Sequence, residues 1–376
     1  MSGVLQVSPT ASTLPRDAGG YKAATLPTAL RRPSLWSPSH HRYRKSWSVV
    51  AGVMYKLAVV LAVLAGAWAE CPSGGAISPC TCKEVMPGRT MECSAITSSS
   101  QLQKVFSTDM PSPDFQFFQI VKLSGRCSLE KIPANVFGTT TFLYVTFGQT
   151  DVVTVDPKAW EGNEDTMLEL TFADANKMTS YPFESLGDMH ALYKFFLSNT
   201  QIDTITHFGP APNLTMVSVT GSQVTTIESG AFEDLGRLTR LDLHDNPLTS
   251  IEDGWFSSST SESWDIYLDG CDISEISPGA FSGTLPSGVF LQNNKFTSIP
   301  EATFRPLVEN MEKRAEAGEL SHYVDLEGNP LVCDCDIKWI ATSETLLPFV
   351  RNAVCTNGDV DGTNIADLPA DFFASC

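Results

Sequence analysis

The apolar positions of the chain follow a pattern that fits neither one helix nor one strand. In the stretch RLDLHDNPLTSIEDGWF, Arg240 to Phe256, the large apolar residues are separated by two, five, three and five positions. An amphipathic helix repeats its apolar residues every three or four positions, and a half-buried strand repeats them every second position. The stretch therefore predicts a strand, a turn and a return path that share one interior.

The same spacing recurs along the chain. Each copy begins with two apolar residues that flank one variable residue, and a small polar residue follows them. Later in the copy comes an Ile or Val, and in most copies an aromatic residue lies five positions after it. The small polar positions recur every 22 to 26 residues, with one last interval of 35 residues. This period is typical of leucine-rich repeats. The small polar positions, which we call the turn ladder, are Cys127, Thr150, Asn176, Thr200, Ser222, Asn246, Cys271, Asn294 and Asn329.

Each repeat forms one coil of the chain. A polar side chain is favoured at the ladder position, because such a side chain can pair with backbone groups of the neighbouring coil. The copies at Cys127 and Asn176 carry one extra residue before the turn, which predicts bulged coils. The interval of 35 residues contains RPLVENMEKRAEAGEL, Arg305 to Leu320, which predicts a short surface helix. We expect an α/β leucine-rich-repeat solenoid with short parallel strands on its concave face and an irregular or short helical convex side.

The cysteines change this picture at the two ends of the repeats. A stack of coils exposes its core at each end unless it is capped. All ten cysteines follow residue 70, and an even number indicates disulfides in an oxidising compartment. A zinc site is disfavoured, because the CTC and CDC spacings are wrong for one and no histidine is near. Four cysteines precede the repeats and four follow them, and each set allows three connectivities: Cys71, Cys80, Cys82 and Cys93, then Cys333, Cys335, Cys355 and Cys376.

The two remaining cysteines, Cys127 and Cys271, both occupy ladder positions. They lie about six coils apart, too far for a disulfide in a stack of this kind. We therefore expect buried free thiols rather than a pair.

The start of the chain contains a short apolar run. MYKLAVVLAVLAGAWAEC, Met54 to Cys71, has a lysine, an apolar core and an A-x-A cleavage signal. The run is short for a membrane anchor, so we expect a signal peptide at 54–69 and a basic, disordered leader at 1–53, with Met54 as the true start. The product is expected to be secreted and extracellular, with no membrane span after signal removal. Its expected parts are an N-terminal cysteine-rich cap at 70–117, repeats at 118–331 and a C-terminal cap at 332–376.

Charge is distributed unevenly between these parts. The formal net charge is −18, but residues 1–53 hold seven basic residues and one acidic residue. The residues after Ala69 hold 17 basic and 42 acidic residues, which makes that part near −25. Such a charge repels nucleic acid and anionic membranes, so a charged partner should be basic or bridged by cations.

Motifs for enzymatic chemistry are absent from the sequence. It contains no G-x-S-x-G, H-E-x-x-H, P-loop or G-x-G-x-x-G motif, so we expect no catalytic residue, cofactor or metal. His244 lies between two acids and is interpreted as a surface histidine. Asn357, Asp359 and Asp361 open like an EF-hand loop, but its twelfth position is Leu368 instead of Glu, so calcium is disfavoured. Asn213-Leu214-Thr215 is an N-glycosylation sequon.

The residues between the inward apolar positions should project from the concave face. Aromatic residues among them would anchor a partner, and carboxylates would steer its approach. The alternative is an ordinary solvated sheet. These residues are Phe196, Ser198, Ser218, Thr220, Asp242, His244, Asp245, Tyr267, Asp269, Phe290, Gln292, Asp325 and Glu327.

The N-terminal cysteine region carries a family resemblance. CPSGGAISPCTCKEVMPGRTMECSAI, from Cys71, and LQKVFS, from Leu102, resemble the non-catalytic subunits of crustacean oplophorus-type luciferases, which are secreted leucine-rich-repeat proteins. The resemblance covers 71–376, and residues 1–53 have no counterpart. It implies that a separate small subunit oxidises coelenterazine and that the repeat subunit associates with it. It also implies four disulfides: Cys71–Cys82, Cys80–Cys93, Cys333–Cys355 and Cys335–Cys376.

Three functions are compatible with these observations to different degrees. The first is a non-catalytic scaffold that binds a secreted protein partner, such as a small catalytic subunit. The second is a soluble recognition protein for microbial or cell-surface ligands, which would use the same face as Toll-like ectodomains do. The third, an enzyme, lacks any supporting set of residues.

Overall fold

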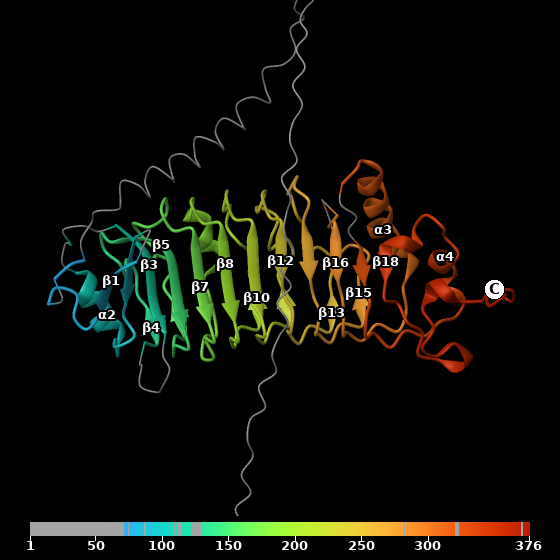
Figure 1. Cartoon of the computed structure of the whole chain (residues 1–376), viewed down its shortest axis with the longest axis horizontal. Coiled ribbons are helices and arrows are strands. Elements are labelled where there is room, and N and C mark those ends of the chain that lie inside the picture. Colours follow the sequence, from blue (N-terminus) through green and yellow to red (C-terminus); the bar gives the residue numbers. More distant parts are fainter. Residues whose placement is uncertain are drawn as a thin grey trace, which may run out of the picture. The chain divides into compact units, whose positions relative to one another are not determined.

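The computed structural model describes residues 71–376 apart from 74, 86–87, 108–109, 111–113, 122–128, 282, 284, 320–322 and 370. The leader expected at 1–53, the signal peptide expected at 54–69 and the ladder residue Cys127 lie outside the described residues. In the described part, one long sheet runs through the repeats from the N-terminal to the C-terminal cysteine region (Figure 1).

The long sheet has twelve strands, and their order in the sheet follows the sequence. The first two strands form an antiparallel hairpin, and every later pairing is parallel, as expected for successive coils. The strands are β1 (Thr81–Val85), β2 (Gly88–Glu92), β3 (Asp114–Val121), β5 (Thr141–Gly148), β7 (Glu169–Ala173), β8 (Lys194–Ser198), β10 (Met216–Thr220), β12 (Arg240–Asp242), β14 (Asp265–Tyr267), β16 (Gly288–Phe290), β17 (Val324–Asp325) and β18 (Val350–Arg351).

Six of the described coils return through a second, shorter strand on the far side of the interior. These strands have two residues each and pair with the equivalent strand of a neighbouring coil. They are β4 (Lys131–Ile132) with β6 (Thr154–Val155), β9 (Thr204–Ile205) with β11 (Thr226–Ile227), and β13 (Ser250–Ile251) with β15 (Glu275–Ile276).

The recurring aromatic residue of the repeat forms a row through the interior. The ring centres of Phe183, Phe208, Phe232, Phe256 and Phe281 follow one another at 4.9, 5.4, 6.4 and 5.6 Å. All five side chains are buried. Offset or edge contacts at such distances add stability beyond the burial of apolar area. Phe232, Phe256 and Phe281 follow an Ile by the five residues expected from the sequence, and Phe183 and Phe208 join the row without that spacing from an Ile or Val.

Side-chain hydrogen bonds of the turn-ladder asparagines join their coils to the preceding ones. Asn246 is buried; its Oδ1 accepts a hydrogen bond from the backbone N–H of Val224 at 3.2 Å. Its Nδ2 donates to the carbonyl oxygens of Val219 at 2.7 Å and Leu243 at 2.8 Å. One amide thus satisfies backbone groups of two coils that have no strand partner. The arrangement recurs at Asn294 and Asn329.

The backbone identifies the ladder position independently of the side chain. In each described coil, the residue before it has a left-handed conformation, with φ between 51° and 73°. Asn, Asp and Gly tolerate this conformation better than other residues do. These preceding residues are Gln149, Asp174, Asn199, Gly221, Asp245, Gly270, Asn293, Gly328 and Asn352.

This criterion corrects one ladder assignment. Asp174 has φ of 53°, so the ladder residue is the fully buried Ala175, whereas Asn176 is exposed. The extra residue of this coil therefore follows the ladder position, before the buried Met178, and the bulge expected before Asn176 is wrong. The sequence favoured Asn176 because it is polar, but alanine leaves the ladder without a side-chain hydrogen bond in this coil.

The N-terminal cysteine region closes the first coil. Disulfides Cys71–Cys82 and Cys80–Cys93 tie the β1–β2 hairpin together. Helix α2 (Ser99–Phe106) follows, and the Ser98 hydroxyl caps it by accepting a hydrogen bond from the N–H of Gln101. The helix buries Leu102, Val105 and Phe106 against the end of the core.

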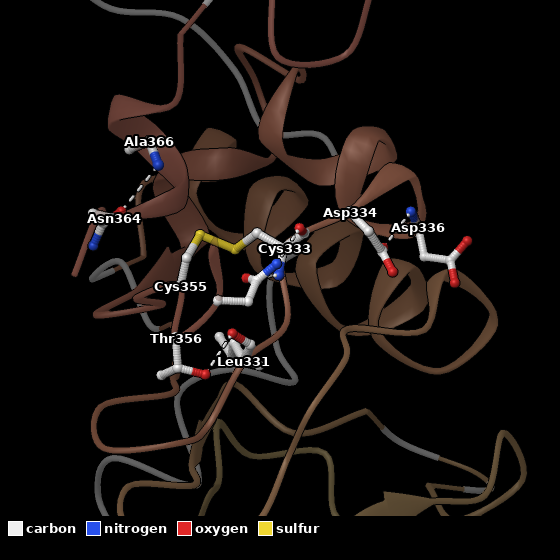
Figure 2. Close-up of a disulfide and its surroundings, with 9 residues drawn as sticks. Leu331, Cys333, Asp334, Asp336, Cys355, Thr356, Asn364 and Ala366 are labelled. Atoms are coloured by element: carbon white, nitrogen blue, oxygen red, sulfur yellow. Dashed lines mark hydrogen bonds between the residues drawn. A yellow bond between two sulfur atoms is a disulfide. The ribbon is translucent and has the colours of Figure 1, made fainter. Parts of the chain in front are cut away.

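The C-terminal cysteine region closes the other end with short helices. Disulfides Cys333–Cys355 (Figure 2) and Cys335–Cys376 complete the four pairs that the family resemblance implied. Thr356 donates to the carbonyl oxygen of Leu331, which ties this cap to the last repeat. The helical segments are η3 (Cys335–Ile337), α4 (Lys338–Ala341), η4 (Leu347–Phe349), η5 (Gly358–Val360) and η6 (Ile365–Asp367). Elsewhere η2 (Phe183–Asp188) and α3 (Glu301–Glu316) lie within the repeats.

The helix expected from Arg305 is confirmed as α3, which begins four residues earlier, after Pro300. It packs Phe304, Leu307 and Val308 into the core, and its opposite side carries Glu301 and Arg305, whose charges pair at 2.7 Å. The long last interval of the repeat therefore accommodates a helix that covers the interior.

We expect Asn294→Ala to lower the free energy of unfolding by about 2–5 kcal/mol, because it leaves several buried backbone groups unpaired. Asn176→Ala is the matched control and should change stability by less than about 0.5 kcal/mol, because Asn176 is exposed. Urea unfolding of both variants checks this. Equal destabilisation by the two substitutions would contradict the corrected ladder.

Cys271 occupies a ladder position with weaker hydrogen bonds. Its Sγ lies 3.6 Å from the carbonyl oxygen of Leu243, and burial raises the pKa of its thiol to about 12. In a Cys127→Ser background, the folded protein should therefore react only slowly with a thiol reagent, without acceleration between pH 7 and 9. Denaturation without reductant should expose one reactive thiol. Rapid labelling of the folded protein would show that Cys271 is accessible.

Candidate functional site

The residues predicted for binding lie on the side of the long sheet that faces away from the core. This side, which we call the outer face, is the one predicted from the sequence as the concave face. This face is formed by strand residues that alternate with buried ones, so Tyr267 and Asp269 flank the buried Leu268. Asp245 lies at the edge of the face, in the left-handed turn after β12. Strand register aligns the first residue of each predicted pair across neighbouring strands: Phe196, Ser218, Asp242, Tyr267, Phe290 and Asp325.

A continuous row of stacked side chains crosses the C-terminal half of the outer face. The Tyr267 and Phe290 rings stack at 4.4 Å with an interplanar angle of 11°, and Tyr323 meets Phe290 edge-on at 5.5 Å. Arg240 lies 3.8 Å from the Tyr267 ring centre, and Arg351 lies 3.7 Å from that of Tyr323. These five residues, which we call the aromatic row, hold one another in place, so a partner would immobilise little further side-chain freedom on contact.

The sequence reasoning missed Arg240, Tyr323 and Arg351. Arg240 and Tyr323 directly precede the first inward residue of their strands, Leu241 and Val324, so they also project outward. The predicted face included only the outward residues that follow the first inward residue of each strand. Partial burial raises the pKa of the Tyr267 hydroxyl, an effect that the positive charge of Arg240 opposes. The ring therefore stays neutral through the physiological pH range.

Two of the predicted carboxylates are committed to internal contacts. Asp242 is 5% exposed and lies 2.7 Å from Arg240 and 2.6 Å from Nδ1 of His244. Asp325 is also 5% exposed and accepts hydrogen bonds from Asn352 and from the N–H of Glu327. Their expected projection toward a partner is wrong, because neighbouring side chains cover them. Both carboxylates instead fix the geometry of the aromatic row and its neighbours.

A second line of outer-face residues lies toward the strand ends. The backbone hydrogen bonds Asp245 N to Asp269 O, Gly270 N to Gln292 O and Asn293 N to Glu327 O extend the strand register. They place His244, Asp269, Gln292 and Glu327 side by side on successive coils. On the N-terminal half of the same face, the equivalent residues Ser198 and Thr220 are small and uncharged.

The N-terminal half of the outer face carries another ring pair that the sequence reasoning missed. Phe117 stacks on Tyr144 at 5.0 Å, and Phe117 is 37% exposed. In the segment DFQFFQIV of β3, Phe117 points outward and the adjacent Phe118 points into the core. Because apolar residues occupy both faces of this strand, the pattern alone does not separate them.

Other polar features found in the sequence have structural partners. Asn357 accepts a hydrogen bond from the Cys333 N–H at 2.7 Å and donates to the Cys333 carbonyl oxygen at 3.0 Å. Its side chain thus holds the C-terminal disulfide, in the segment that resembled the opening of a calcium loop. The described residues contain no group of three or more His, Cys, Asp or Glu that could hold a metal ion.

A surface cleft of about 410 Å³ lies in the loops that lead back to β7 and β8. Trp160 and Met189 line it together with Glu164, Asp165 and His190, and His190 lies 3.0 Å from Asp165. Both members of this pair are well exposed. The cleft therefore offers an exposed polar contact rather than a shielded reaction site.

The glycosylation sequon lies beside this cleft. Asn213 is exposed, donates to the carbonyl oxygen of His190 at 2.7 Å and accepts from Arg237 at 3.1 Å. It lies three residues before β10, at the strand-start edge of the sheet. A glycan there would extend from this edge. No helix among the residues that the structure describes has the length and apolar character needed to cross a membrane.

Comparisons with known proteins agree with this architecture. A family model described as leucine rich repeat matches residues 212–262. The octameric complex of Latrophilin 3, Unc5D and FLRT2 (LRR) contains a chain that matches with a TM-score of 0.50 and 17% identity, over 81% of this chain and 99% of its own length. At that identity the likeness shows the fold alone.

Several proteins match this chain in sequence, among them a receptor and an enzyme subunit. A probable glycoprotein hormone G-protein coupled receptor of Anthopleura elegantissima is 30% identical over 154 residues, which span 40% of this chain but only 16% of the receptor. The oplophorus-luciferin 2-monooxygenase non-catalytic subunit of Oplophorus gracilirostris is 27% identical over 342 residues, which span 81% of this chain and 88% of the relative. The chain therefore has a leucine-rich-repeat fold with disulfides near both ends, and over most of its length it is similar to that non-catalytic subunit.

Proposed function

We propose that this protein is a secreted, non-catalytic subunit that binds a separate protein through the outer face of its long sheet. The observation that carries the proposal is the similarity over 88% of the length of a relative named as a non-catalytic subunit of a monooxygenase. Because the match covers 81% of this chain and 88% of the relative, the likeness extends beyond one shared repeat. We infer that the reaction, if one is assembled, belongs to the partner.

The outer face supports this proposal physically. Rigid, half-buried aromatic side chains are favourable anchors, because they contribute a large contact area and lose little conformational freedom. Tyr267 and Phe290 are half-buried and held between Arg240 and Tyr323. The surrounding acidic character favours the approach of a basic partner.

Secretion is part of the proposal and is supported by the four disulfides, which form in oxidising compartments. Expressed from Met54 in insect cells, the protein should leave the cell and begin near Glu70. Endoglycosidase treatment should lower its mass, and Asn213→Gln should abolish that change. Mass spectrometry of the secreted product checks both. Retention of the protein in the cell would contradict the extracellular assignment.

Binding is tested by capture from the native secretion, followed by measurement with the purified partner. Replacing both Tyr267 and Phe290 with Ala should weaken binding at least about 30-fold, because it removes central aromatic anchors. The matched control replaces Phe117 and Tyr144, the stacked pair on the other half of the same face, and should keep binding within about threefold. Surface plasmon resonance gives both affinities, with circular dichroism as the check on folding.

The recovery of no stoichiometric protein would contradict the subunit proposal. If the variant in which Tyr267 and Phe290 are replaced binds with unchanged affinity, the protein is a subunit that binds its partner through another surface. That result would contradict the proposed role of the outer face.

A further inference from the structure

We propose that Asp269, Gln292 and Glu327, beside the Tyr267–Phe290 stack, form a docking surface for an arginine side chain in a basic segment of the partner. This inference rests on the proposed function and adds the chemistry of the contact. We call these three residues the acceptor row. Each of their side-chain groups can accept a hydrogen bond from a partner, and two of them are carboxylates.

The register of the sheet brings the acceptor row together. Gly270 N donates to Gln292 O and Asn293 N donates to Glu327 O, so the three residues occupy equivalent positions on consecutive coils. Neighbouring strands lie about 4.8 Å apart, which places Asp269 and Glu327 about 10 Å apart with Gln292 between them. All three project from the outer face two residues after Tyr267, Phe290 and Asp325.

The acceptor row has unused capacity for hydrogen bonds. Gln292 Oε1 is buried and has no hydrogen-bond partner among the described residues. An unpaired buried acceptor is costly, so a donor that reaches it gains more than one that meets an exposed oxygen. Neither Asp269 nor Glu327 forms an ion pair within the part of the chain that the structure describes. Asp242 and Asp325, by contrast, are already engaged.

The aromatic row determines how a cation would approach. Arg240 and Phe290 cover the two faces of the Tyr267 ring, so an incoming cation does not stack on it. Its aliphatic stem packs along the ring edges, and its charged end reaches the acceptors. A guanidinium has five donors in one plane and bonds an amide oxygen and a carboxylate at once, whereas an ammonium is a compact point charge. The geometry therefore favours arginine over lysine.

Charge near the acceptor row also favours a cation. Among the described residues, the basic side chains on this half of the face are Arg240, which pairs with Asp242, Arg351, which stacks on Tyr323, and His244, which contacts Asp242. Asp245 adds a further exposed carboxylate beside Asp269 at the strand-end edge. The chain after Ala69 is strongly acidic as well, so a basic segment is attracted first by the whole body and then by this surface.

The experiment uses the full secreted protein and an acetylated eight-residue peptide in which four arginines alternate with glycine. Two twin peptides carry citrulline or lysine in place of arginine. Affinity is measured by isothermal titration at about 0.15 M salt, where the screening length of about 8 Å suppresses attraction by distant charges. The arginine peptide should bind, and the lysine and citrulline peptides should bind at least about fivefold and tenfold more weakly.

Three variants locate the contact. Asp269→Asn combined with Glu327→Gln should weaken binding of the arginine peptide about tenfold. Gln292→Leu should weaken it about fivefold without changing the charge. The control combines Glu344→Gln with Asp359→Asn, two exposed acids of the C-terminal cap, and should change affinity by less than about twofold. Thermal unfolding verifies that each variant is folded.

Equal losses in the acceptor-row pair and the cap pair would mean that general acidity binds the peptide, and would overturn the inference. Equal binding of the lysine peptide would overturn the assignment to arginine. A captured partner whose affinity is unchanged by Asp269→Asn with Glu327→Gln would leave the proposed function intact and refute this docking surface. Selective peptide binding without any captured partner would support the surface chemistry and refute the subunit role.

Discussion

The hydrogen bonds between turn-ladder side chains and the preceding coil are the constraint on which this structure depends. A strand that turns after a few residues leaves backbone groups inside the fold, and water cannot reach them there. Asn246 and Asn294 each supply one acceptor and two donors at that point. In the coils that carry these asparagines, the long sheet, the inward rings and the outer face keep their register because the amides fix the turn.

The repeat fold could be predicted from the sequence because the pattern is redundant. Many copies share the spacing, so an error in one coil does not change the architecture. Asn176 shows the limit of that redundancy. Its polarity favoured it as the ladder residue, but the left-handed Asp174 places Ala175 there. Side-chain type alone does not reveal a backbone conformation, and an Asp or Asn before the turn would have been the better guide.

The candidate site was harder to predict than the fold. Alternation along each strand correctly distinguishes inward Leu268 from outward Tyr267, but it does not show what an outward side chain contacts. Asp242 projects from the sheet and is nevertheless buried, because Arg240 and His244 close over it. Such contacts join side chains of different strands, or side chains of residues that are two positions apart in the sequence. They depend on register and rotamer, which a one-dimensional pattern does not contain.

The β1–β2 hairpin has a consequence for how such a chain can change in evolution. Its antiparallel direction differs from every later pairing in the long sheet, and two disulfides hold the hairpin region together. A duplicated repeat added outside this hairpin would meet a strand of the wrong direction, and two disulfides hold the segment that closes the C-terminal end. The array therefore gains or loses units only in its interior, and its ancestry should be recorded in the middle coils rather than at its termini.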